Sequence, residues 1–160
     1  MRRLNFGILL FWAITWASSC EKDDICVEGD TPLLVIEFYD ATDTSTLKEV
    51  TTLRVVGVGQ TVTVGTFTDR SSLSSITIPL KTDEDSASFI MINESASDDN
   101  GSETGNLDTI SFSYSRIEDF LSRGCGFIVN YDELEANVTA DTDNWIQDIE
   151  ITQSLVTNSD

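Results

Sequence analysis

The sequence predicts an all-β protein, with a single antiparallel β-sandwich of about eight strands after an N-terminal export segment. Short apolar runs recur along the chain, with turn residues about every 8–12 positions. Within most runs, apolar and polar residues alternate with the period of two that suits a half-buried strand. Only one short stretch has helical periodicity. An up-and-down barrel is the alternative architecture.

The first expected strands are rich in apolar and β-branched residues. The run 33–39 is apolar on both faces, which is typical of a buried strand. The following segment, 40–49, is rich in Thr, Asp and Ser, so we expect a turn region there. Strands are then expected at 53–58 and at 61–64, the second with a continuation over 66–68 after Gly65. Gly57 and Gly59 indicate a turn or a bulge.

The middle of the chain alternates strands with polar connections. A polar turn is expected at 69–75 and a strand at 76–80, where Pro79 indicates a sheet edge or a strand end because proline cannot donate a hydrogen bond. The next strand is expected at 87–92. Segment 93–106, rich in Ser, Asp, Asn and Gly, is the longest expected loop.

The clearest strand pattern lies at 107–115. Alternation there predicts three inward-facing side chains, Ile110, Phe112 and Tyr114. The period then changes: Ile117, Phe120 and Leu121 are spaced at i, i+3 and i+4, which predicts a single helical turn over 116–122.

The last third of the chain predicts a strand pair and one final strand. Strands are expected at 127–131 and 134–138, with a turn at 132–133 between them. The final strand is expected over 145–155, and residues 157–160 are expected to fray. The β-sandwich domain is therefore expected to span 32–156.

The N-terminus has the layout of an export signal. Arg2 and Arg3 precede an apolar run over 6–16, and small residues follow. A run of about 11 residues is short for a membrane span, which needs about 20. A cleaved signal peptide over 1–19 is therefore favoured over a retained transmembrane helix.

The expected cleavage site resembles the bacterial lipobox. The motif Ala17-Ser18-Ser19-Cys20 has alanine where the usual lipobox has leucine. The resemblance implies that the Cys20 sulfur carries a diacylglycerol and that Cys20 begins the mature chain. The alternative is an ordinary signal peptide, with Cys20 as a disulfide partner.

Acidic residues directly follow the expected lipidated cysteine. The stretch Lys22-Asp23-Asp24 resembles the surface-export signal of Bacteroidota lipoproteins. It implies an outer-membrane protein that faces the medium, on a lipidated tether over 20–31. The alternatives are a merely solvated acidic tether and an outer-membrane protein that faces the periplasm.

Charge limits the class of partner. Arg2 and Arg3 are the charged residues of 1–19, so the mature chain of 141 residues has a net charge of about −21. Such a field repels nucleic acid and anionic lipid head groups. Nucleic acid is not an expected partner, whereas cations, basic protein surfaces and neutral glycans remain open.

Two cysteines remain if Cys20 is lipidated. An exported protein folds in an oxidising compartment, so we expect a disulfide between Cys26 and Cys125. The alternative is two separate buried thiols.

Catalytic chemistry has little support in the composition. The sequence contains no histidine, the commonest general base and metal ligand. The many paired carboxylates are expected to be solvated turn residues, and a carboxylate-based hydrolase is a lesser hypothesis. Ca²⁺ is the one cofactor considered, because acidic loops supply clustered oxygens. Its weak candidate ligands, outside any EF-hand spacing, are Asp98, Asp99, Glu103, Asp141 and Asp143.

Three segments together resemble a known family. They are 20–26, 32–40, and 110–114 leading to 125–127. They resemble an uncharacterised family of Bacteroidota lipoproteins, chiefly flavobacterial, described as a domain of unknown function. The resemblance implies a small exported β-domain with a cysteine near each end, and it implies no activity.

These observations predict a non-enzymatic exported lipoprotein. We expect a surface-displayed binding or accessory module, with an unidentified protein or glycan as its partner. The alternative is a periplasm-facing structural or assembly subunit of an outer-membrane complex.

The expected disulfide gives the first testable prediction. Cys26→Ser should lower the melting temperature under non-reducing conditions only. A bridge closing a loop of roughly 100 residues contributes about 4.7 kcal/mol in the chain-entropy model. Thermal unfolding with and without reductant measures the effect. An unchanged melting temperature without reductant would contradict the bridge.

Overall fold

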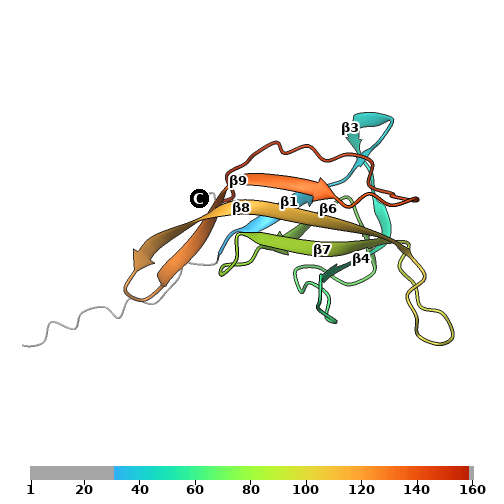
Figure 1. The fold of residues 1–160 in the computed structure, drawn as a ribbon, viewed down its shortest axis with the longest axis horizontal. Helices are drawn as coiled ribbons and strands as arrows, with labels where there is room; N and C mark the ends of the chain where they lie inside the picture. Colours follow the sequence, from blue (N-terminus) through green and yellow to red (C-terminus); the bar gives the residue numbers. More distant parts are fainter. Residues whose placement is uncertain (1–30, 159–160) are drawn as a thin grey trace, which may run out of the picture.

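The computed structural model describes residues 31–158 and confirms the all-β antiparallel fold class. Its described residues form nine strands and no helix (Figure 1). The strands are β1 Leu33–Glu37, β2 Tyr39–Asp40, β3 Asp43–Leu47, β4 Val50–Gly57, β5 Ser71–Leu73, β6 Ser75–Pro79, β7 Ser86–Asn93, β8 Asn106–Ser122 and β9 Gly126–Val138.

The sandwich has two unequal layers. The larger layer is a five-stranded antiparallel sheet in the order β5-β4-β7-β8-β9. The smaller is a ribbon of β1 and β6, in which Leu34 pairs with Ile78. A separate hairpin joins β2 to β3. The ribbon lies against one face of the large sheet, and the core fills the space between the two layers.

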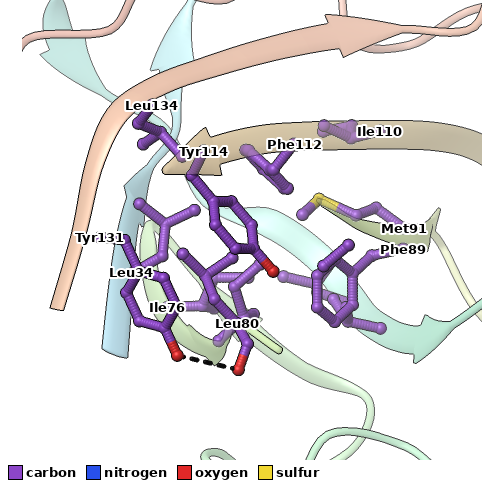
Figure 2. Packing of buried hydrophobic residues seen from close by; sticks show 14 of the residues in the cluster. Leu34, Ile76, Leu80, Phe89, Met91, Ile110, Phe112, Tyr114, Tyr131 and Leu134 are labelled. Carbon is purple, nitrogen blue, oxygen red and sulfur yellow. Dashed lines mark hydrogen bonds between the residues drawn. The ribbon is translucent and has the colours of Figure 1, made fainter. Parts of the chain in front are cut away.

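Alternation in the long strands decides which side chains enter this core. The expected inward-facing residues Ile110, Phe112 and Tyr114 are all buried, as the period of two requires. They belong to the same buried cluster as the ribbon side chains Leu34 and Ile76 (Figure 2), and Ile78 is part of that cluster too. Phe89 packs edge-on against Phe112, with 6.2 Å between ring centroids.

Tyr131 links the two layers by a polar contact inside the core. Its side chain is fully buried, and its hydroxyl donates a hydrogen bond to the Leu80 carbonyl over 3.2 Å (Figure 2). Its ring packs edge-on against Tyr114, with centroids 5.0 Å apart. Burial raises the pKa of Tyr131 to about 12, so the hydroxyl stays a donor at neutral pH.

The expected buried character of the first strand is wrong for one of its faces. Leu34 is buried under the sheet, but Val35 is 60% exposed. β1 pairs only with β6, and the outer face of this two-stranded ribbon has no covering layer among the described residues. A run that is apolar on both faces therefore does not guarantee burial on both.

The expected helical turn over 116–122 is also wrong. This segment continues β8, and Phe120 lies opposite Phe127 of β9. A single turn gains too few hydrogen bonds to offset its nucleation cost, whereas the neighbouring strand pairs along the whole segment. The expected turn at 132–133 is a bulge inside β9, where Glu133 has a φ of 52°.

Other element boundaries differ from the sequence expectation. The turn regions 40–49 and 69–75 contain the short strands β3 and β5. The expected strand at 61–68 is a loop with one isolated bridge, Val56 to Thr63. Pro79 ends β6, which confirms the expected strand end.

The expected final strand over 145–155 is wrong, because this segment makes little ladder pairing. Trp145 packs on Phe38 with centroids 6.0 Å apart, and its Nε1–H donates to the Met91 carbonyl over 3.3 Å. Only the end of the segment meets the outer edge of β9. There the Tyr131 and Val156 amides donate to each other's carbonyls, at 3.0 and 2.7 Å.

Packing of the ribbon gives a prediction with an internal control. Leu34→Ala should lower the free energy of unfolding by about 2–5 kcal/mol, because it leaves a cavity between the layers. Leu33→Ala changes the same residue type on the exposed face and should cost no more than about 0.5 kcal/mol. Leu34 is 7% exposed and Leu33 is 39% exposed. Urea unfolding measures both variants, and equal losses would contradict the two-layer packing.

Candidate functional site

The N-terminal candidates lie outside the described residues. They are the signal peptide 1–19, the lipidation residue Cys20, the export signal Lys22-Asp23-Asp24 and the disulfide residue Cys26. Their roles remain predictions. Among residues 31–158, no helix is long and apolar enough to cross a membrane.

Cys125 lies in the turn that joins β8 to β9. Its backbone N–H donates to the Ser122 hydroxyl over 3.0 Å, and Gly126 beside it has a φ of +75°, which favours glycine. Cys125 is the one cysteine within 31–158, so no complete disulfide falls inside the described residues, although Cys125 is itself in the disulfide-bonded state. Its pairing with Cys26 stays a prediction.

The loop between β7 and β8 is organised around the Glu103 carboxylate. Oε1 accepts the backbone N–H groups of Ala96 at 3.0 Å and Gly105 at 3.2 Å. Oε2 accepts the Ser95 hydroxyl at 3.0 Å. Burial raises the pKa of Glu103, but the hydrogen bonds from Gly105, Ser95 and Ala96 outweigh it, so the pKa lies below its usual value.

Two arginines complete this cluster. Arg70 Nη2 lies 3.4 Å from Glu103 Oε2, and Arg54 Nη1 lies 3.8 Å from the same oxygen. Arg54 also lies 3.7 Å from Asp69. Both Glu103 oxygens therefore accept hydrogen bonds from the protein itself. Glu103, which the sequence offered as a weak Ca²⁺ ligand, thus has a structural role in this loop.

Asp98 and Asp99 lie at the tip of the same loop. Asp98 Oδ1 accepts the backbone N–H groups of Ser102 at 2.8 Å and Asn100 at 2.9 Å, which hold the pKa of Asp98 below its usual value. Asp99 is exposed. Asp98 thus closes the tight turn at the tip, where Gly101 has a φ of +82°.

The second acidic loop adjoins the first. Asp141 Oδ1 accepts the N–H of Asp143 over 2.9 Å, and the Asp143 carbonyl accepts a hydrogen bond from Asn106 Nδ2 over 2.7 Å. Asn106 begins β8, so it connects the two loops. Even so, no group of three or more Asp, Glu, Cys or His side chains within 31–158 is arranged to hold a metal ion.

Asp108 is a buried carboxylate that the sequence interpretation did not single out. It is 0% exposed, and its Oδ2 accepts the Ile146 N–H over 2.7 Å. Its Oδ1 has no hydrogen-bond partner. Asp108 lies two residues before Ile110 on the same strand, so alternation places it on the inward face. A carboxylate at an inward-facing position is the sequence signal that could have identified it. It fastens the C-terminal segment to the sheet.

The described surface includes two open hollows whose linings mix polar and apolar atoms. One, of about 600 Å³, is lined by Ser113, Tyr114, Ser115, Glu133, Leu134, Glu135 and Ser154. The other, of about 420 Å³, lies along the 138–147 loop. Small-molecule sites are usually enclosed and mostly apolar, with a few convergent polar groups. Neither of these two hollows has that form.

The fold and these surfaces define a small antiparallel β-domain whose charged side chains mainly organise its loops. The chain belongs to the family of unknown function DUF6452, whose model matches residues 52–160. The match covers nearly all of the five-stranded sheet, and β1 to β3 precede it. The expectation of a domain of unknown function is confirmed to this extent. No curated protein and no solved structure matches the chain significantly.

The Glu103 cluster predicts a pH-dependent contribution to stability. Glu103→Gln should lower the free energy of unfolding by about 1–3 kcal/mol at neutral pH, because charged hydrogen bonds are lost. Because the pKa of Glu103 is lower in the folded than in the unfolded chain, its ionised carboxylate stabilises the fold. This contribution is complete above the pKa of the unfolded state, about 4.3 for glutamate. It is lost as the pH falls through the lower pKa of the folded state. The difference between wild type and Glu103→Gln should therefore shrink below about pH 4.3.

Urea unfolding from pH 7 to pH 3 measures this difference. Asp99→Asn removes a carboxylate from the exposed tip of the same loop and is the matched control, with little expected effect. A difference between wild type and Glu103→Gln that stays constant across this range would contradict the assigned role of the charge.

Proposed function

We propose that this protein is an exported lipoprotein, held at the outer membrane by a diacylglycerol on Cys20. The observation that carries the proposal is the motif Ala17-Ser18-Ser19-Cys20, directly behind a basic start and a short apolar run. Acyl chains hold a protein firmly once two or more are buried in the bilayer. On this proposal, the family is one of Bacteroidota lipoproteins, as the sequence resemblance implies.

The proposal places the domain on the cell surface. Lys22-Asp23-Asp24 follows Cys20 as a surface-export signal would. On this proposal, residues 20–31 are the lipidated tether that links the anchor to the domain.

The domain acts as a non-catalytic binding or accessory module. Several of its acidic side chains accept hydrogen bonds within turns, which supports this role. Asp40 accepts hydrogen bonds from the Thr42 hydroxyl and backbone, and with Lys48 these hold its pKa well below the usual value. Asp43 is likewise held by Ser45 and Thr46. Such carboxylates shape turns and give the surface its negative charge.

That charge selects the kind of partner. Carboxylates with lowered pKa values stay ionised well below neutral pH, so the surface remains negative. We propose a basic protein surface or a neutral glycan as the partner, and not a nucleic acid. A disulfide between Cys26 and Cys125 completes the proposal by tying the tether to the β8–β9 turn.

The anchor and the facing are tested together. Wild-type protein should sediment with membranes, and protease added to intact cells should digest it. Cys20→Ser removes the thiol that receives the lipid, so this variant should leave the membrane fraction. Immunoblotting of fractionated and protease-treated cells measures both outcomes.

The remaining outcomes distinguish the alternatives. A Cys20→Ser variant that stays on the membrane would contradict the lipid anchor. A wild-type protein that is retained on the membrane but protected from protease faces the periplasm, which would favour the structural or assembly role. A periplasmic marker that remains intact shows that the protease did not enter the cells.

A further inference from the structure

The β8–β9 hairpin extends beyond the rest of the sheet. β7 pairs with β8 only as far as Ser113, whereas β8 and β9 continue to pair up to Ser122 and Gly126. We call residues 116–131 the arm. Figure 1 shows it in orange, projecting at the left end of the molecule. Beyond Ser113 and Asp132, the two strands of the hairpin pair with no other described strand.

The far end of the arm is apolar. Phe127 is 68% exposed and Phe120 is 54% exposed, the most exposed aromatic side chains among the described residues. Their rings pack edge-on with centroids 5.2 Å apart. Leu121 beside them is also exposed. Exposed apolar patches of this kind mark protein or membrane contacts.

The apolar side chains occupy both faces of the arm. Opposite residues of an antiparallel pair share a face, so Phe120 and Phe127 lie on one side. Ile117 has the other parity and is exposed on the other side, while Leu121 lies at the register shift between Phe120 and Ser122. A flat protein partner would cover one face only, whereas a surrounding apolar medium would receive both.

The arm does not share the strong negative charge of the whole chain. Arg116 and Arg123 balance Glu118 and Asp119, so residues 116–131 have no net charge, while the mature chain has about −21. Arg123 lies in the exposed turn at the very end. An arginine there can keep its guanidinium at the head groups while its stem follows apolar surface. The net charge of the arm therefore does not oppose contact with a bilayer surface.

The tether brings this end of the molecule to the membrane. Cys125, in the turn of the arm, is disulfide-bonded, and with Cys20 lipidated its partner would be Cys26. Cys26 comes six positions after Cys20, so their Cα atoms lie at most about 22 Å apart. Leu34, at the start of β1, also packs beside Tyr131 at the base of the arm (Figure 2). Both connections place the anchor and the arm at the same end.

From these observations we infer that the tip of the arm, formed by Phe120, Leu121 and Phe127, inserts shallowly into the lipid leaflet that holds the Cys20 anchor. The inference rests on the proposed lipid anchor. It adds a second membrane contact, which fixes the orientation of the domain. The partner is a lipid surface with apolar chains within reach of shallow insertion, about 5–10 Å deep for peripheral segments.

The test uses the lipidated protein in phosphatidylcholine vesicles and a tryptophan placed at the tip. Phe127→Trp preserves an aromatic ring, and Trp145 is the one tryptophan of the mature chain, so its constant emission can be subtracted. With vesicles present, the added tryptophan should emit at a shorter wavelength than it does in buffer without vesicles. It should lose most of its emission in vesicles with brominated acyl chains, because bromine quenches only on contact.

Leu107→Trp is the matched control. Leu107 is exposed near the other end of β8, thirteen residues from Phe120, or about 43 Å along the strand. Its emission should be the same in brominated and ordinary vesicles. Equal quenching at the two positions would overturn the inference, because the tip would then have no special contact with lipid.

Flotation of the same vesicles separates the two proposals. Protein that floats with the vesicles while Phe127→Trp is not quenched retains its anchor and overturns the tip insertion. That result would assign the exposed phenylalanines to a protein partner. Protein that does not float overturns the lipid anchor, and the tip insertion fails with it.

Discussion

The packing of the β1–β6 ribbon onto the five-stranded sheet is the interaction on which the rest of the structure depends. A single sheet leaves one apolar face in water, and only a second layer removes it. Leu34, Ile76 and Ile78 supply that layer from two short strands. The Tyr131 hydroxyl reaches across to the Leu80 carbonyl, so the base of the arm is fixed to the same core. A projecting hairpin needs such a fixed base, because beyond it the two strands have only each other.

Alternation of apolar and polar residues predicted the buried face correctly for strands that pair on both sides within the large sheet. β7 and the first half of β8 follow the expected pattern closely, and Pro79 ends β6. The pattern failed in the arm, where apolar residues on both faces of a ribbon imitate the spacing of a helix. It failed again over 145–155, because an apolar stripe specifies burial but not a ladder partner. Trp145 reaches the core without belonging to a strand.

The candidate sites also differ in how far the sequence alone could identify them. The motif around Cys20 can be recognised without the fold, because a lipobox consists of adjacent residues, and its role stays a prediction. The environment of Glu103 was not readable, since Arg54 and Arg70 come from distant parts of the chain and reach it only after β4 and β7 pair. Asp108 could have been noticed as a carboxylate in an inward register. Its function as a fastening point depends on Ile146, which no spacing rule connects to it.

The late pairing of Val156 with Tyr131 has a consequence for the newly made chain. Until residues 154–156 are present, the outer edge of β9 exposes unpaired amides at Tyr131 and Leu134, whose hydrogen-bond acceptors are the Val156 and Ser154 carbonyls. A bare strand edge is a template for pairing with another molecule, and therefore a starting point for aggregation. Residues 154–156 close this edge. A chain truncated before residue 154 would thus keep the five-stranded sheet but expose a self-associating edge.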